Sequence, residues 1–193
     1  MRGTAHLIIG ACAGAAISVV LLGGGRGLIV PAALVGVLGG LLPDIDHPRS
    51  TLGRLFPWPV ASTPPNSRGF VRYGRRWFGR RTIWHRGETH SLGAAAIAGT
   101  GAFILFRWLA HAGLPVMHPG ILALALITGY LSHLAADLCN ISPLMLGWPL
   151  SRRMVRLPWN GVRENSMLGH VTEWTASLVA IAVMWSVLGG KMP

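Results

Sequence analysis

Long apolar runs alternate with polar connections along this chain, and their lengths are typical of membrane-spanning helices. The runs cover residues 6–22, 28–42, 91–109, 120–138 and 168–188. A helix needs about 20 residues to cross about 30 Å of hydrocarbon, and only the second run is short for a span. Backbone groups inside a bilayer must pair within their own segment, so helices are the expected structure. The pattern predicts an all-α integral membrane protein, a single domain over residues 1–193 with about five transmembrane helices.

The first apolar run follows Arg2 and has the outline of a signal peptide. It is longer than the usual hydrophobic region of a signal peptide, and residues 23–26 that end it offer no small-x-small cleavage site. We therefore expect this run to be a retained span. Glycine and alanine are dense in the first three runs, which favours closely packed helices.

Two long polar connections, residues 48–89 and 139–167, separate the predicted spans. Nearly all of the 17 Lys and Arg residues lie in these connections or at the N-terminus. The exceptions are Arg26, Arg107 and Lys191. Basic residues concentrate in the cytoplasmic loops of membrane proteins. We therefore predict that the N-terminus and both long connections face the cytoplasm.

Composition supports a lipid environment, because 51% of the chain is hydrophobic and only 12% is charged. A soluble domain carries about 25% charged residues. The net charge of +11 suits anionic lipid head groups, and it would suit a nucleic acid equally well. The two cysteines, Cys12 and Cys139, lie in apolar runs and predict no disulfide framework.

Acidic and histidine residues gather at the predicted cytoplasmic end of every span. These residues are His6, Asp44, Asp46, His47, His85, Glu88, His90, His133, Asp137, His170 and Glu173. Ionisable groups at this depth are costly and are usually functional. His111 and His118 fall at the opposite end, and we expect no role for them.

Each motif also has a purely structural interpretation when it is taken alone. His133 and Asp137 are four residues apart and share a helix face, as a hydrogen-bonded pair would. The segment before the third run fits a loop and helix start with Thr89 or Ser91 as N-cap. The convergence of all the motifs at one end favours ligands for metal ions.

Imidazole and carboxylate groups without cysteine form a ligand set for zinc, manganese or iron. The predicted ligands are His6, Asp44, His47, His85, His90, His133, Asp137 and Glu173. These are too many for one tetrahedral ion, so we predict two or three metal ions, with zinc first. Two metals about 3.5–4 Å apart can activate water and stabilise the departing oxygen of a phosphoester.

Other residues beside these motifs have candidate roles in a hydrolysis reaction. Asp46 or Glu88 is the predicted catalytic base that orients the attacking water. Arg49 and Arg86 flank the motifs and are predicted to grip a substrate phosphate in forked geometry. We expect most other arginines to rest on lipid head groups.

At these residues the sequence resembles a family, the YdjM-like bacterial inner-membrane metal-dependent hydrolases. The resemblance spans nearly the whole chain, and its matching pieces are His6 and residues 41–48, 85–92 and 129–137. The family is distantly similar to zinc-dependent phospholipases C and single-strand zinc nucleases, which are helical and hold zinc clusters with His, Asp and Glu. The resemblance implies a phosphoester hydrolase in the bacterial inner membrane.

The last ligand departs from the pattern of that family, in which a glutamate follows the second connection after a Gly-Ser or Gly-Asn step. Here Asn165 and Ser166 precede Glu173 at a distance. Glu173 fits best as the counterpart, because the last apolar run follows it directly. Glu164 and His170 stay open as alternatives.

The leading functional hypothesis is a cytoplasm-facing hydrolase of a phospholipid or isoprenoid phosphate at the inner leaflet. The second is a non-catalytic membrane protein in which metal staples the helices and the Arg-rich connection recruits a partner or a nucleic acid. A metal-ion or proton-coupled transporter is disfavoured, because the ligands lie at one membrane end and the outer halves of the spans lack acids.

Overall fold

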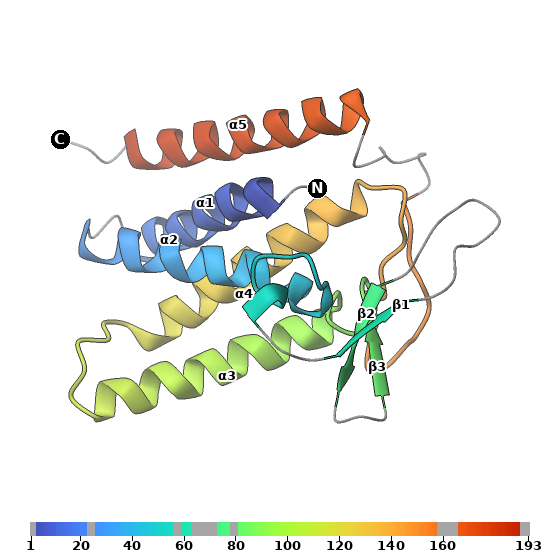
Figure 1. Ribbon diagram of the computed structural model, residues 1–193. Helices are drawn as coiled ribbons and strands as arrows, with labels where there is room; N and C mark the ends of the chain where they lie inside the picture. The colour runs from blue at the N-terminus through green and yellow to red at the C-terminus, as the bar shows by residue number, and fades with distance from the viewer. Residues whose placement is uncertain are drawn as a thin grey trace.

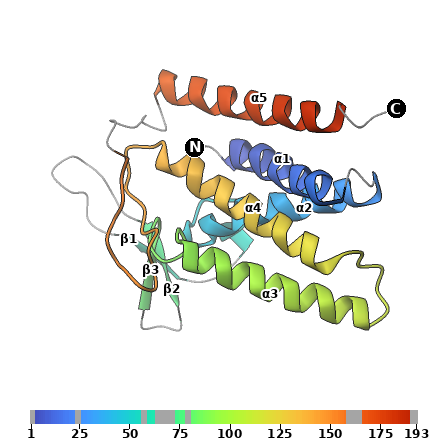
Figure 2. The ribbon, with the colours of Figure 1, turned by 180° about the vertical axis from the view of Figure 1, so that it is seen from behind.

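Five long helices form most of the protein. The computed structural model describes residues 3–22, 26–55, 59–62, 73–77, 81–157 and 166–189. The helices are α1 (Gly3–Leu22), α2 (Arg26–Leu41), α3 (Leu92–His111), α4 (Pro119–Leu138) and α5 (Met167–Gly189). They lie side by side in one bundle, with α5 beside α1 and α3 on the opposite side (Figure 1 and Figure 2). The predicted helical fold class is confirmed.

Four of these helices, α1 to α4, are long and apolar enough to cross a membrane. Helix α5 has 23 residues, which extend about 34 Å at 1.5 Å per residue. A fifth span therefore stays a prediction that its length permits. The helices alternate in direction, so the starts of α1, α3 and α5 and the ends of α2 and α4 share one end of the bundle (Figure 1).

The first long connection, which was expected to be a loop, contains a small sheet. Strands β1 (Val60–Ser62), β2 (Tyr73–Trp77) and β3 (Arg81–Trp84) pair antiparallel in the order β1-β2-β3. Strands of three to five residues are too short to give a clear alternation of apolar and polar positions. Two 3₁₀ helices, η1 (Leu42–Asp46) and η2 (Gly53–Leu55), follow α2 directly.

Glycines allow α2 to touch both α1 and α4 through the backbone. A Cβ atom added to Gly129 of α4 would lie 2.1 Å from the carbonyl oxygen of Gly36 of α2. A Cβ added to Gly36 would in turn lie 2.3 Å from the carbonyl oxygen of Gly10 of α1. No side chain fits at such separations, so these positions require glycine for close helix packing. This packing brings the polar ends of α1, α2 and α4 within side-chain reach of one another.

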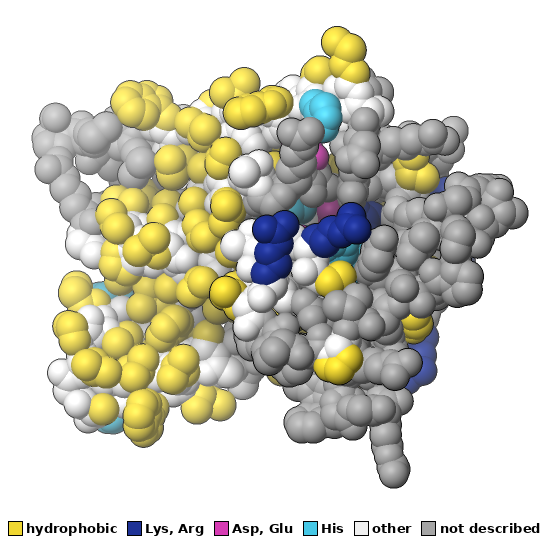
Figure 3. All heavy atoms as spheres, in the orientation of Figure 1, with side chains coloured by type: hydrophobic (Ala, Val, Ile, Leu, Met, Phe, Trp, Pro, Cys, Tyr) yellow, Lys and Arg dark blue, Asp and Glu magenta, His cyan; other side chains and the backbone are white. Residues whose placement is uncertain are grey.

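The outer faces of the helices carry large apolar side chains. Hydrophobic side chains cover the helical part of the face shown in Figure 3. On α3, Ile97, Ile104 and Trp108 are each more than 60% exposed. An apolar surface of this extent is unfavourable in water and favourable against lipid chains.

The predicted orientation can be tested at Cys139, which is exposed at the C-terminal end of α4, whereas Cys12 is buried. A membrane-impermeant maleimide is expected to label Cys139 in inside-out membrane vesicles and to leave it unlabelled in right-side-out vesicles. The Cys139→Ser variant, which retains Cys12, is the control for background. Labelling of Cys139 only in right-side-out vesicles would reverse the orientation derived from the arginine distribution.

Candidate metal centre

The polar end of the bundle gathers histidine and carboxylate side chains from four separate segments. Helix α1 supplies His6, and η1 supplies Asp44 and Asp46 immediately after α2. The segment between β3 and α3 supplies His85 and His90, and the last turns of α4 supply His133 and Asp137. These seven side chains form three overlapping groups whose ligand atoms lie within 4.8 Å of one another.

Four of these residues, His90, His133, Asp44 and Asp137, form what we call the four-ligand cluster. Nε2 of His90 lies 3.4 Å from Oδ1 of Asp44 and 3.6 Å from Oδ2 of Asp137. Nε2 of His133 lies 3.6 Å from the same Asp44 oxygen and 3.7 Å from the same Asp137 oxygen. Hydrogen bonds between nitrogen and oxygen are typically about 2.7–3.2 Å long, which is shorter than these four separations. Atoms bound at about 2.0–2.1 Å to one tetrahedral zinc ion lie about 3.3 Å apart, so these nitrogen–oxygen separations suit metal ligands. Asp44 belongs to one ligand group with His90 and His133, and Asp137 belongs to the adjoining group with His6 and His133.

The two imidazoles of the four-ligand cluster are buried without a hydrogen bond on the nitrogen that faces the carboxylates. His90 and His133 are 0% and 1% exposed. Their Nε2 atoms have no hydrogen-bond partner among the described residues. A buried polar atom left unpaired costs about 1–3 kcal/mol. A metal ion between them would satisfy both nitrogens and both carboxylates.

The backbone fixes which nitrogen of His133 faces the cluster. Nδ1 of His133 lies 2.7 Å from the carbonyl oxygen of Gly40, the residue before the last of α2. A carbonyl oxygen only accepts hydrogen bonds, so Nδ1 carries the proton. The lone pair of Nε2 is therefore directed at the carboxylates, which is the arrangement expected of a metal-binding histidine.

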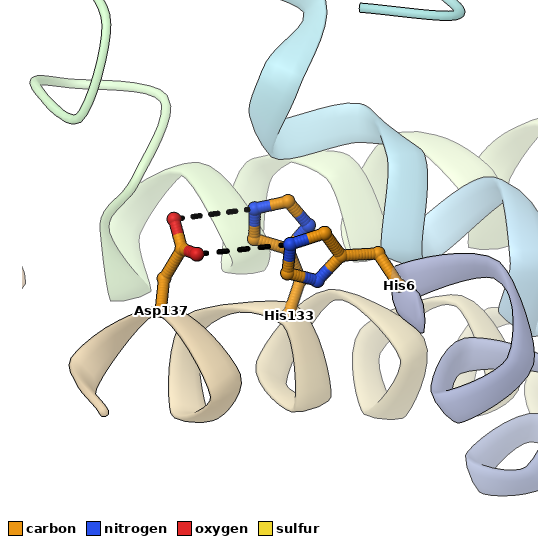
Figure 4. A group of neighbouring side chains, drawn as sticks. All are labelled: His6, His133 and Asp137. Carbon is orange, nitrogen blue, oxygen red and sulfur yellow. Dashed lines mark ion pairs between the residues drawn. The ribbon is translucent and has the colours of Figure 1, made fainter. Parts of the chain in front are cut away.

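His6 extends the cluster on the side of α1. Its ring stacks on the ring of His133 with a centroid separation of 3.7 Å and an interplanar angle of 18°. Nε2 of His6 lies 3.7 Å from Oδ1 of Asp137, whereas His133 faces Oδ2 of that carboxylate (Figure 4). Oδ1 of Asp137 thus faces His6, whereas Oδ2 faces His90 and His133. Asp137 would therefore be able to supply one oxygen to each of two neighbouring metal sites.

Asp46 and His85 form a third pairing next to the four-ligand cluster. Oδ1 of Asp46 lies 3.1 Å from Nδ1 of His85, within hydrogen-bonding distance. Burial opposes the charged form of His85, but the hydrogen bond and the charge of Asp46 outweigh it and raise the pKa of His85 above its ordinary value. Burial has the larger effect on His90 and lowers its pKa, which favours the neutral imidazole that binds metal.

Charge at this end of the bundle is unbalanced toward carboxylates. Asp44, Asp46 and Asp137 lie together, and the one buried guanidinium among the described residues is that of Arg86. Its Nη2 lies 3.5 Å from Oδ2 of Asp137, and its Nη1 donates to the carbonyl oxygen of Ser142 at 3.3 Å. Buried charges require compensation. One or two divalent cations would supply it.

A cavity of about 220 Å³ opens onto these groups. Asp44, Asp137 and His6 line it together with His47, His85, Arg49, Arg86, Leu41, Ser50 and Thr51. Arg49 is exposed at this cavity, whereas Arg86 is held by Asp137. The lining therefore combines candidate metal ligands, hydroxyl groups and two positive charges.

Some predicted site residues lie outside the three ligand groups found among the described residues. His47 lines the cavity, with its ring edge-on to His85 at 4.6 Å, because the chain becomes extended at His47 after η1. Glu88 also lies outside the groups, and its carbonyl oxygen accepts from the hydroxyl of Ser91. Their roles as ligand and base stay predictions.

Glu173 lies on the face of α5 that packs against α1, and not in the ligand groups of the described residues. It is buried beside a 60 Å³ pocket that Thr4, Ala5 and Ile8 also line. Its Oε2 lies 3.8 Å from Nδ1 of His170. The role of Glu173 as a metal ligand stays a prediction, and Glu164 falls outside the described residues.

The sequence suggested Thr89 only as a candidate N-cap, but in the structure it joins two parts of the site. Its hydroxyl bonds to Asp46 and lies next to the ring of His90. The N-cap of α3 is Ser91, whose side chain accepts from the amide of Ala94 at 3.0 Å. The capping role therefore falls to Ser91, and Thr89 is left for the site. A hydroxyl between histidines was the only signal available.

Comparisons with known proteins agree with a membrane location. The family described as YdjM inner membrane protein matches residues 1–191. The chain is 35% identical over 170 residues to the "Inner membrane protein YdjM" of Escherichia coli (strain K12), a match that covers 82% of this chain and 70% of that protein. The protein of the same name from Shigella flexneri matches with the same identity and coverage. No solved structure matches the chain. The predicted inner-membrane location is confirmed, and the cytoplasmic orientation stays a prediction.

Proposed function

This chain belongs to the YdjM inner membrane protein family, and on that premise we propose that it is a metal-dependent hydrolase of phosphoesters. The observation that carries the proposal is the four-ligand cluster, whose nitrogen and oxygen atoms lie 3.4–3.7 Å apart beside a cavity. A purely structural hydrogen-bond network would bring these atoms closer together.

The residues of the site fit zinc, with manganese or iron as other candidates. His90, His133, Asp44 and Asp137 would hold one ion. His6, with the second oxygen of Asp137, would hold another on the side of the cavity. Bound divalent ions supply a Lewis acid for phosphoryl oxygens and a means of activating water.

The cavity lining suits a phosphate group. Arg49 is exposed at the cavity, where its guanidinium would meet a phosphate that enters from the membrane surface. Ser50 and Thr51 bring hydroxyl groups to the same lining. Arg86 lies against Asp137, so its charge would reach a phosphate without forming the forked grip that the sequence suggested.

We assign the water-orienting role to His85, with Asp46 behind it. Both oxygens of Asp46 accept hydrogen bonds, one from His85 and one from Thr89, and its side chain is buried. A carboxylate so engaged holds a neighbouring imidazole in place better than it takes a proton from water. His85 itself lines the cavity, within reach of a water there.

The substrate class we propose is a membrane lipid phosphate, such as a phospholipid or an isoprenoid phosphate. The cavity lies at the ends of α1, α2 and α4, where lipid head groups would surround it. Leu41 at the end of α2 contributes an apolar wall to the same cavity. A phosphate could thus enter the site while its apolar chain stays among the lipids.

The alternative role is a metal staple without catalysis. The ligands come from α1, η1, the segment before α3 and α4, which are far apart in the chain. A metal ion that joins these segments would stabilise the bundle even if no substrate were turned over. That role predicts metal-dependent stability with no hydrolysis.

The test is metal content followed by hydrolysis with the protein in lipid nanodiscs. We expect about one or more transition-metal ions per chain, release of phosphate or a head group from lipid phosphates, loss of this activity with chelator, and recovery when metal is returned. The substrate panel includes phosphomonoesters, phosphodiesters and an oligonucleotide. A protein without bound metal would refute the proposal, and stoichiometric metal without hydrolysis of any lipid phosphate would favour the staple.

A further inference from the structure

We propose that Thr89 is a positioning residue for the metal centre, acting through His90. The hydroxyl of Thr89 links Asp46 to the ring of His90 and sets which nitrogen of that ring faces the four-ligand cluster. The inference rests on the metal centre of the proposed function and adds a residue that is not itself a ligand.

The direction of the hydrogen bonds follows from what each group can donate. Oγ1 of Thr89 donates to Oδ2 of Asp46 at 2.6 Å, since an ionised carboxylate only accepts. A hydroxyl has one proton, so Oγ1 acts as the acceptor toward Nδ1 of His90 at 3.2 Å. Nδ1 of His90 therefore carries the proton, and Nε2 keeps its lone pair.

The free lone pair of His90 lies where a metal ion would need it. Nε2 is 3.4 Å from Asp44 and 3.6 Å from Asp137, and it has no hydrogen-bond partner among the described residues. The His90 ring is fully buried, so water cannot replace a missing partner. With the other tautomer, an N–H group would point at the carboxylates and no lone pair would be available to a metal.

Neighbouring contacts hold this hydrogen-bond relay, which runs from Asp46 through Thr89 to His90, in place. The hydroxyl of Tyr130 on α4 donates to the carbonyl oxygen of Thr89. The other oxygen of Asp46 accepts from Nδ1 of His85 at 3.1 Å. The Thr89 carbonyl and the Asp46 carboxylate that accepts from the Thr89 hydroxyl are thus both held by neighbours.

The two imidazoles of the four-ligand cluster differ in how their tautomers are fixed. His133 depends on the backbone carbonyl of Gly40, which no side-chain substitution removes. His90 depends on the Thr89 side chain, so a single substitution can test the relay. Groups that orient metal-binding histidines typically change metal affinity about 10–100-fold when they are removed.

The experiment compares Thr89→Val, which keeps the shape and removes the hydroxyl, with Thr89→Ser, which keeps the hydroxyl. Apo protein is reloaded with Zn²⁺, and the Kd is measured by competition with a chromophoric chelator. We expect Thr89→Val to weaken Zn²⁺ binding about 10–100-fold and Thr89→Ser to stay within about threefold of the parent protein. Thr100→Val, at an exposed threonine on α3, is the matched control and should not change the Kd.

A second readout follows the coordination directly. Loading with Co²⁺ should give a visible d–d spectrum that changes in Thr89→Val and is restored in Thr89→Ser, which a loss of general stability would not produce. Thr89→Ala is measured in parallel, so the comparison with serine stands if the valine variant does not fold.

The outcomes separate this inference from the function on which it rests. Metal binding by the parent protein with an unchanged Kd in Thr89→Val, or a Thr89→Ser variant as weak as Thr89→Val, overturns the relay and leaves the metal centre intact. A parent protein that binds neither Zn²⁺ nor Co²⁺ overturns both.

Discussion

Replacing His133 by asparagine is expected to weaken metal binding by more than about 100-fold and to abolish hydrolysis. The amide nitrogen of asparagine can still donate to the carbonyl oxygen of Gly40, as Nδ1 of His133 does. The substitution removes Nε2, which lies 3.6–3.7 Å from Asp44 and Asp137. The substitution would therefore disrupt the four-ligand cluster more than the packing of α4. The loss of metal binding is measured by metal content, using mass spectrometry, and by the Kd for Zn²⁺.

The matched control for this variant is His111→Asn, because His111 is exposed at the far end of α3. It should keep the metal content and the activity of the parent protein. Gel filtration and thermal unfolding in the presence of chelator establish that both variants fold alike without metal. An unchanged metal content in His133→Asn would show that the four-ligand cluster does not hold the ion.

Much of this cluster was predictable because helices impose simple spacing rules. His133 and Asp137 are four residues apart and lie on the same face of α4. In the structure, Nε2 of His133 lies 3.7 Å from Oδ2 of Asp137. The alternation of spans placed the other ligands at the same end of the bundle. Neither inference required knowledge of how the helices pack.

The sequence could not predict in which direction each side chain of η1 points. Asp44 and Asp46 lie in a 3₁₀ helix with about three residues per turn, so side chains two apart point in different directions. Asp44 faces His90 and His133, whereas Asp46 faces His85 and Thr89. A dense acidic motif therefore divides into one candidate ligand and one supporting residue.

Tertiary packing decided the positions of Glu173 and Arg86. Glu173 was expected at the cluster because it begins the last apolar run, but α5 packs on α1 and buries this side chain there. Arg86 was expected to grip a substrate phosphate in forked geometry. Its backbone adopts a left-handed conformation with φ of 65°, and its side chain is buried against Asp137. Spacing along the chain contains no information on either contact.

Replacing His85 by asparagine is expected to lower the rate of phosphoester hydrolysis about 10²–10⁴-fold while the metal stays bound. The asparagine amide can still donate to Asp46, which keeps the Asp46–Thr89–His90 relay in place. It has no nitrogen able to take a proton from water. The lower rate would appear in kcat, because His85 lines the cavity but is not one of the four residues of the four-ligand cluster.

His111→Asn serves again as the control, because His111 is exposed at the far end of α3. It lies outside the three ligand groups of the described residues and should keep the rate of the parent protein. Loss of metal in His85→Asn would instead make His85 a ligand, as the group of Asp46, His85 and His90 permits. Full activity of His85→Asn with metal bound would remove His85 from the reaction and return the role of base to Asp46 or Glu88.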